Sequence, residues 1–132
     1  MDLQVKGRRA LVTGSTAGIG FAIAQALAAE GANVIVNGRT EKRVQEACEK
    51  LKRSGVSGKV EGVASDLGTA EGVQSVTARF PEVEILVNNV GIFEPKPFEQ
   101  ISDADWFRFF EVNVMSGVRL SRHYLPRMKE KN

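Results

Sequence analysis

Residues 13–20, which read TGSTAGIG, carry three glycines at a spacing that suits the binding of an anion. Gly14 lets the chain turn sharply after an apolar run, and Gly18 removes the side chain where a diphosphate must approach the backbone. Gly20 lets the following helix pack close to the sheet. The free N–H groups and the positive dipole end of that helix would face the phosphates. A glycine pattern alone is also compatible with a plain turn, so its place between an expected strand and an expected helix is what favours nucleotide binding.

A guanidinium group follows the second apolar run, in Asn37-Gly38-Arg39. A carboxylate at the position of Gly38 would accept hydrogen bonds from an adenosine ribose and would repel a 2′-phosphate. No acid stands there, and Arg39 can clamp a phosphate, which favours NADP(H) and leaves NAD possible. The alternative is that Arg39 stacks on the adenine or points to solvent. The glycine turn itself carries no basic residue, which weakens the case for NADP.

Polar residues also end the third and fourth apolar runs. Asp66 follows the third run, where a carboxylate can accept a hydrogen bond from an adenine amino group. The alternative is that Asp66 caps the following turn, as Asp commonly does. Asn88-Asn89-Val90-Gly91 follows the fourth run. A bare Asn-Asn-x-Gly indicates only a turn, but its position after an apolar strand makes it more specific.

The elements that would position these residues follow from the apolar patterns. Four short runs rich in β-branched residues predict strands at residues 9–13, 33–37, 59–64 and 84–88. Helical patterns alternate with them: residues 16–30 closed by Gly31, a helix capped by Thr40, a helix that begins at Thr69, and a long bent or broken region from Ser102 to about residue 129. This alternation requires right-handed crossovers, and the central runs are apolar throughout, as in strands covered on both faces. We therefore predict an α/β fold, a Rossmann-type doubly wound parallel sheet that is truncated after the fourth strand and the long helix.

An amide stands among aromatic residues in the long helical region. The helical period that begins at Trp106 places Phe109, Phe110, Asn113 and Gly117 on one face, which we expect to be buried. Asparagine is a poor helix former and a buried amide needs hydrogen-bond partners, so local propensity does not explain its presence. Asn113 is therefore a candidate functional residue. The alternative is a structural asparagine satisfied by nearby backbone.

Together these segments resemble the amino-terminal half of the short-chain dehydrogenase/reductase family. The family pattern Thr-Gly-x-x-x-Gly-Ile-Gly is matched completely at residues 13–20, and Asn-Asn-Ala-Gly is matched except at Val90. The resemblance implies a catalytic role for Asn113, which in the family holds a water that relays protons. It also implies that the cofactor is bound by Gly14, Ser15, Thr16, Gly18, Ile19, Gly20, Arg39, Asp66, Leu67, Asn89 and Gly91.

The catalytic residues that follow in the family, a serine and a Tyr-x-x-x-Lys pair, have no counterpart in the 132 residues. Tyr124 is the only tyrosine and has no lysine four residues later. We therefore expect residues 1–132 to be the amino-terminal part of a single dinucleotide-binding domain, with the catalytic part absent and no turnover of its own. The fourth strand would then lie at an open apolar edge.

Composition narrows the class of partner. With 42% apolar and 26% charged residues, the chain has a net charge of +2, too close to neutral to suggest nucleic acid or an anionic membrane as partner. A single cysteine offers neither a disulfide nor a metal cluster. No apolar stretch could span a bilayer and no signal peptide is present, so we expect a cytoplasmic protein. Phe107, Val114 and Val118 give the long helical region a second apolar face, which indicates subunit packing, and the family resemblance implies a homodimer or homotetramer.

These features predict an NAD(P)-dependent oxidoreductase that moves hydride between NADP(H) and a carbonyl or secondary alcohol. A non-catalytic dinucleotide-binding sensor or regulatory module is the main alternative. A Rossmann-like methyltransferase is disfavoured, because it would require an acid after the second strand, where Gly38 and Arg39 stand.

Overall fold

The four predicted strands form one parallel sheet. The computed structural model describes residues 2–131, and its strands are β1 (Arg9–Val12), β2 (Asn33–Gly38), β3 (Val60–Ala64) and β4 (Ile85–Val87). They are hydrogen-bonded in the order β3-β2-β1-β4, with Leu11 of β1 opposite Ile35 of β2 and Leu86 of β4. In this order the chain crosses back over β1 to add β4 on its other side, as in one half of a doubly wound sheet. The predicted fold class is confirmed.

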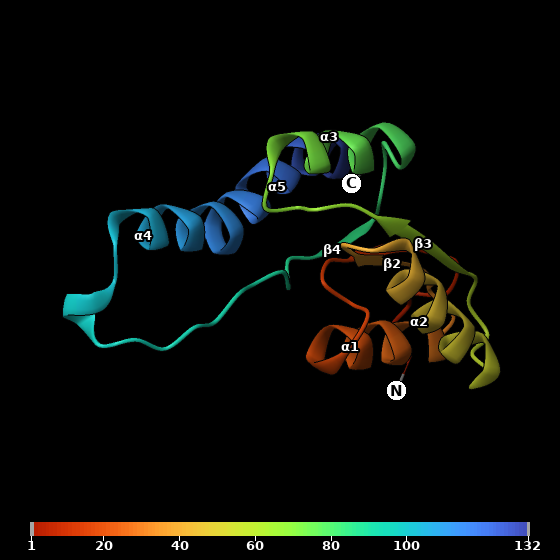
Figure 1. The fold of residues 1–132 in the computed structure, drawn as a ribbon. Helices are drawn as coiled ribbons and strands as arrows, with labels where there is room; N and C mark the ends of the chain where they lie inside the picture. Colours follow the sequence, from red (N-terminus) through yellow and green to blue (C-terminus); the bar gives the residue numbers. More distant parts are fainter. Residues whose placement is uncertain (1, 132) are drawn as a thin grey trace.

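Helices cover both faces of this sheet (Figure 1). One face carries α1 (Gly18–Ala29) and α2 (Glu41–Arg53), and the other carries α3 (Ala70–Arg79) and α5 (Ser116–Glu130). Because side chains alternate along a strand, Ala10 and Val12 pack against the first pair of helices and Leu11 packs against the second. All three side chains are completely buried, which confirms that the central strands are covered on both faces.

Three helices begin at the predicted caps. The Oγ atoms of Thr40, Thr69 and Ser102 accept hydrogen bonds from N–H groups in the first turns of α2, α3 and α4 (Asp103–Phe110). The first helix differs from the prediction, because α1 begins at Gly18 rather than at residue 16. Gly14 and Gly18 take left-handed φ angles of +59° and +60°, so the turn continues further before the helix starts.

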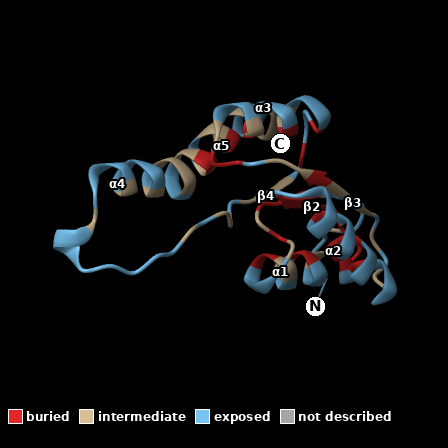
Figure 2. Ribbon diagram, viewed as in Figure 1, coloured by how far each residue is buried: buried red, intermediate tan, exposed pale blue. Residues whose placement is uncertain are grey.

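The helical region that follows Ser102 is continuous from residue 103 to residue 130, but a π-helical turn interrupts its α-helical hydrogen bonding, so the predicted break is only this change of helix type. The whole region after β4 contains the 3-10 turn η1 (Phe98–Gln100), α4, the π-helical turn η2 (Glu111–Met115) and α5. The face that we expected to be buried is largely open: Trp106 is 52% exposed, Phe110 is 54% exposed, and Asn113 is exposed as well. That prediction was wrong, because a helical period identifies an apolar face but not its partner. Within residues 2–131, α4 extends past the elements that could cover it (Figure 2).

β4 lies at an edge of the sheet and, among the described residues, pairs only with β1. Each residue of β4 is half-buried, in contrast with the completely buried centre of β1. The open apolar edge expected for the fourth strand is therefore present in residues 2–131.

The packing of α2 agrees with its apolar pattern. Val44, Ala47, Cys48 and Leu51 are all buried, and burial raises the pKa of the Cys48 thiol. The single cysteine is thus a core residue. No helix of residues 2–131 combines the length and the apolar character that crossing a membrane requires.

Candidate functional site

A cleft of about 710 Å³ opens at the carboxyl ends of the strands. Its walls come from the loops that follow the four strands, together with residues of α4 and η2. Ligands of doubly wound sheets bind at this end, where the strand order reverses, and the volume is typical of a small-molecule site. Seven of the residues predicted to bind a cofactor line the cleft: Gly14, Thr16, Arg39, Asp66, Leu67, Asn89 and Gly91.

The other predicted residues lie next to this lining. Gly18, Ile19 and Gly20 form the first turn of α1, where the side chain of Ile19 is 76% exposed. Ser15 is completely buried beneath the turn. Asn113 lies in η2, directly after Val112, which lines the cleft.

The glycine turn leaves the start of α1 open to an anion. Ala17 occupies the N-cap position and provides no side-chain hydrogen bond, so the first N–H groups of α1 lack the partner that α2 and α3 have. A Cβ atom at Gly18 would meet nothing within 4 Å, which marks open space beside the backbone. A Cβ atom at Gly20 would instead collide with the carbonyl oxygen of Gly14. Gly18 therefore gives a ligand access to the backbone, and Gly20 lets the helix lie against the turn.

The buried hydroxyl of Ser15 supports the turn from below. It donates to the carbonyl oxygen of Val12 over 2.6 Å and accepts a hydrogen bond from the N–H of Asn37 over 2.9 Å. The N–H of Ser15 in turn donates to the carbonyl oxygen of Asn37 over 2.8 Å. The hydrogen bonds of Ser15 with Asn37 therefore attach the turn to the end of β2.

The loop after β4 packs directly on the same turn. Asn89 Nδ2 donates to the carbonyl oxygen of Gly14 over 3.1 Å, and the N–H groups of Asn89 and Val90 donate to Thr13 Oγ1 over 2.8 and 3.0 Å. Val90, where the family pattern has alanine, lies against the turn as well. A Cβ atom at Gly14 would be 3.3 Å from its Cγ2, so the larger residue leaves little room for any side chain at position 14.

The end of β2 has no room for an acidic side chain. Gly38 is buried, and a Cβ atom there would collide with the Cγ2 methyl of Thr16 and lie 3.2 Å from Cγ2 of Val44. Arg39 is exposed and lines the cleft immediately after this glycine. Packing around Gly38 thus disfavours a carboxylate at this position, where the sequence has none.

A second guanidinium, that of Arg43, lines this part of the cleft and was not predicted from the sequence. Arg43 lies in the first turn of α2, and its N–H donates to Oγ1 of the cap residue Thr40 over 3.4 Å. The predicted cap at Thr40 could have identified Arg43. In a parallel sheet, a helix that follows a strand begins at the end of the sheet where ligands bind, so residues in its first turn lie near the site.

Asp66 caps the turn after β3 and also lines the cleft. Its Oδ1 accepts the N–H of Gly68 over 2.9 Å, and its carbonyl oxygen accepts the N–H of Thr69 over 3.2 Å. The capping alternative is therefore present in the structure. Leu67, the next residue, is only 2% exposed and packs in the core with Val76.

Asn113 makes two hydrogen bonds with one backbone residue. Its Oδ1 accepts the N–H of Ile92 over 2.7 Å, and its Nδ2 donates to the carbonyl oxygen of Ile92 over 3.1 Å. The structural alternative considered for this asparagine is thus present, although the residue is exposed rather than buried. A Cβ atom at Gly91 would be 3.3 Å from Asn113 Oδ1, so the amide lies beside the lining of the cleft.

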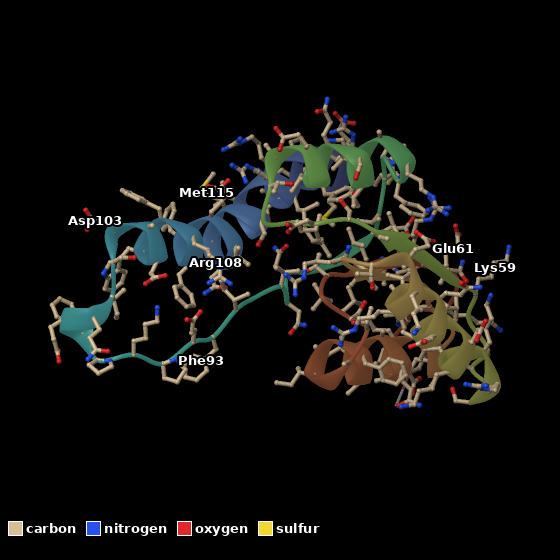
Figure 3. All side chains as sticks on the ribbon, viewed as in Figure 1. Lys59, Glu61, Phe93, Asp103, Arg108 and Met115 are labelled. Atoms are coloured by element: carbon tan, nitrogen blue, oxygen red, sulfur yellow. The ribbon has the colours of Figure 1, made fainter. Side chains whose placement is uncertain are left out.

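Ion pairs connect the loop after β4 to α4. Glu94 pairs with Arg108 over 3.2 Å and Lys96 pairs with Asp105 over 3.1 Å, and Figure 3 shows Arg108 on the side of α4 that faces the loop. The hydrogen bond from Lys96 is the main cause that lowers the pKa of Asp105. Phe93, in the same loop, is 90% exposed. Of these four residues Arg108 lines the cleft, so its pair with Glu94 connects the lining to the loop after β4.

The tyrosine of this chain is structural. Tyr124 of α5 is completely buried, and its hydroxyl donates to the carbonyl oxygen of Phe80 over 2.6 Å. Burial raises the pKa of Tyr124 to about 12. A hydroxyl with this partner and this pKa is not poised for proton transfer in the cleft, in agreement with the missing lysine four residues later.

The parallel sheet, the glycine turn at the start of α1 and the cleft over the strand ends together define a dinucleotide-binding fold of the Rossmann type. The chain belongs to the short chain dehydrogenase family, whose sequence profile matches residues 8–132.

Relatives of known length show how much of the family the chain represents. Uncharacterized oxidoreductase YvaG of Bacillus subtilis (strain 168) is 55% identical over 131 residues, which cover 99% of this chain and 50% of YvaG. The 3-oxoacyl-[acyl-carrier-protein] reductase FabG of Escherichia coli (strain K12) is 36% identical over 98% of this chain and 52% of its own length. The crystal structure of L-sorbose reductase from Gluconobacter frateurii, complexed with NADPH and L-sorbose, has a TM-score of 0.88 at 39% identity and covers 99% of this chain and 51% of that chain. The chain thus spans about half the length of the curated relatives that it matches.

Proposed function

We propose that the chain is the cofactor-binding half of an NADP(H)-dependent oxidoreductase that acts on a carbonyl or a secondary alcohol. The observation that carries this proposal is the cleft, which is lined by the glycine turn and, beside the end of β2, by the guanidinium groups of Arg39 and Arg43. Membership of the family and the NADPH bound by the related L-sorbose reductase support it. When bound, the nicotinamide would supply or accept the hydride.

The residues of this chain would bind and orient the cofactor. The N–H groups at the start of α1 would hold the diphosphate, where the helix dipole favours negative charge. Arg39 and Arg43 would bind the 2′-phosphate, since Gly38 offers no acid to repel it. Asp66 would accept a hydrogen bond from the adenine through the carboxylate oxygen that Gly68 does not use.

Asn113 is proposed to act at the other end of the cleft. The family resemblance implies that it holds a water for proton transfer, and its position beside Gly91 suits that role. Its bonds to Ile92 hold η2 against the loop after β4. Proton transfer in the family also needs the serine and the tyrosine–lysine pair. We therefore expect residues 1–132 alone to bind cofactor without turnover, which an assay of NADPH oxidation with carbonyl substrates would check.

Calorimetry of the intact protein with NADP⁺ and NAD⁺ tests the cofactor preference. We expect tighter binding of NADP⁺, and we expect Arg39→Ala and Arg43→Ala each to weaken it by at least about tenfold, since a hydrogen bond to a charged group contributes about 1.5–3 kcal/mol. Binding of NAD⁺ should change little. Arg53→Ala is the matched control, because it removes the same charge from an exposed position at the far end of α2. Equal affinity for the two cofactors, or the same loss in the control, would refute the assignment.

Exposed apolar side chains support assembly of the intact protein into a homodimer or homotetramer. Figure 2 shows that α4 is largely exposed, and the apolar residues on α4 and its continuation are Trp106, Phe107, Phe110, Val114 and Val118. A patch of this kind commonly marks a contact between proteins. Light scattering of the intact protein would measure the assembly, and the variant Phe107→Glu/Val114→Glu should dissociate it. A monomeric wild-type protein would contradict the proposal.

A further inference from the structure

We propose that Asn37 is a positioning residue for dinucleotide binding, whose buried side-chain amide fixes the glycine turn relative to the end of β3. The inference rests on the proposed function, because it concerns the same cleft. Asn37 is called a positioning residue because its side-chain amide holds Gly14 and the end of β3 by hydrogen bonds.

The side chain of Asn37 reaches the glycine turn on one side of its own strand and the end of β3 on the other. Oδ1 accepts the N–H of Gly14 over 3.0 Å, and Nδ2 donates to the carbonyl oxygens of Val63 and Ser65 over 3.3 Å each. β2 lies between β1 and β3 in the sheet, so the amide bridges the chain that leaves β1 and the chain that leaves β3. Asn37 is only 1% exposed, and water therefore cannot easily replace these bonds.

The bridged loops form two different walls of the cleft. Gly14 is the first glycine of the turn, with a φ angle of +59°, and Ser65 immediately precedes Asp66. All three residues line the cleft. Because β2 lies between β1 and β3, these two strands do not pair with each other. The side-chain amide of Asn37 connects the loop after β1 to the end of β3 across β2. A site whose walls are held in place before the ligand arrives loses less entropy on binding, and this raises affinity.

An amide of this length matches what the surrounding groups require. One N–H and two carbonyl groups face the side chain, so it must offer an acceptor and two donors. Aspartate has no donor, and leucine has neither donor nor acceptor. Glutamine has the same groups on a side chain that is one methylene longer, which a closely packed site does not accommodate without a shift.

The same strand contains a matched control. Asn33, at the other end of β2, also bridges neighbouring loops: its Nδ2 donates to the carbonyl oxygen of Gly7 over 3.3 Å, and its Oδ1 accepts the N–H of Lys59 over 3.0 Å. It lies at the amino end of the strand and does not line the cleft. Both asparagines thus connect loops, but only Asn37 adjoins the site.

The test compares Asn37→Ala and Asn33→Ala in the intact protein by calorimetric titration with NADP⁺ and NAD⁺ and by thermal unfolding. We expect both variants to lower Tm. Asn37→Ala should in addition weaken the binding of both cofactors by at least about tenfold. The ratio of the two affinities should stay unchanged, because the substitution acts on the turn that binds the diphosphate, which both cofactors contain. Asn33→Ala should bind both cofactors within roughly twofold of wild type. Asn37→Ser, which keeps one donor of the two, should show the same effect at a smaller loss of Tm and serves if the alanine variant does not fold.

The outcomes separate the two claims. A lowered Tm for Asn37→Ala or Asn37→Ser with wild-type affinity for both cofactors would overturn the positioning role and leave the proposed function intact. Loss of NADP⁺ binding alone would also overturn it, since that result would assign Asn37 to the 2′-phosphate rather than to the turn. A wild-type protein that binds neither cofactor would refute the proposed function, and this inference with it.

Discussion

Replacing Gly38 by alanine should destabilise the protein through a single methyl group. The new Cβ would collide with Cγ2 of Thr16 and lie 3.2 Å from Cγ2 of Val44. Thr16 is β-branched and half-buried, so rotation about its χ1 gives little relief. Overpacking of this kind costs about 1–3 kcal/mol of the free energy of unfolding, and the smaller backbone entropy of an unfolded alanine returns about 0.4–1 kcal/mol. We therefore expect a net loss of about 1–2 kcal/mol.

A double-mutant cycle isolates the cause. Thr16→Ser removes the methyl that the new Cβ would meet and keeps the hydroxyl, so Gly38→Ala should cost less in that background, with a coupling energy of about 1 kcal/mol. Urea unfolding of the four proteins, followed by circular dichroism, measures each free energy of unfolding. Costs that add to within about 0.3–0.5 kcal/mol, or a Gly38→Ala variant as stable as wild type, would refute the reasoning. If the cycle behaves as expected, an acid at position 38, which would favour NAD, requires a smaller residue at position 16.

Two further predictions concern Tyr124 and Asn113. Because burial raises the pKa of Tyr124 from 10.0 to about 12, its contribution to stability is complete below pH 10.0 and is lost as the pH rises through about 12. Tyr124→Phe should abolish this loss of stability at high pH. By leaving the carbonyl of Phe80 without its donor, it should also lower the free energy of unfolding by about 1–2 kcal/mol at neutral pH. Urea unfolding over a pH series measures both effects, and a variant whose stability falls with pH as steeply as that of wild type would contradict the assignment. Asn113→Ala should accelerate hydrogen exchange at the N–H of Ile92, which NMR can follow, because Asn113 Oδ1 is the acceptor of that group. Asn88→Ala, which removes a bond to Ser121 instead, should leave this exchange rate unchanged.

Local features of the sequence were sufficient to predict most of the fold. Apolar runs such as residues 34–36 identified strands because both faces of those strands are covered, and caps such as Thr40 and Ser102 identified helix starts because a side-chain hydroxyl satisfies a free N–H group there. The glycine spacing likewise predicted the turn, since Gly14 and Gly18 take φ angles that other residues rarely adopt. The extent of α1 was less predictable, because the second of these φ angles delays the helix.

Features that depend on distant contacts could not be predicted in the same way. The role of Asn37 depends on Gly14 and Ser65, which are brought together only by the strand order. The position of Arg43 in the cleft depends on how α2 lies against the end of β2. The exposure of Asn113 was mispredicted for the opposite reason, because the helical period indicates apolar character without saying whether another element covers it.

The hydroxyl of Thr13 constrains how the molecule can deform. It accepts two N–H groups from the chain that leaves β4 and donates to the carbonyl oxygen of Val87 over 3.3 Å, while Thr13 itself begins the glycine turn. These hydrogen bonds resist sliding of the loop after β4 against the glycine turn, and the bond from Asn89 Nδ2 to the carbonyl oxygen of Gly14 couples the two loops further. A bound molecule that contacts both loops would therefore meet two surfaces whose spacing the Thr13 hydroxyl helps to fix.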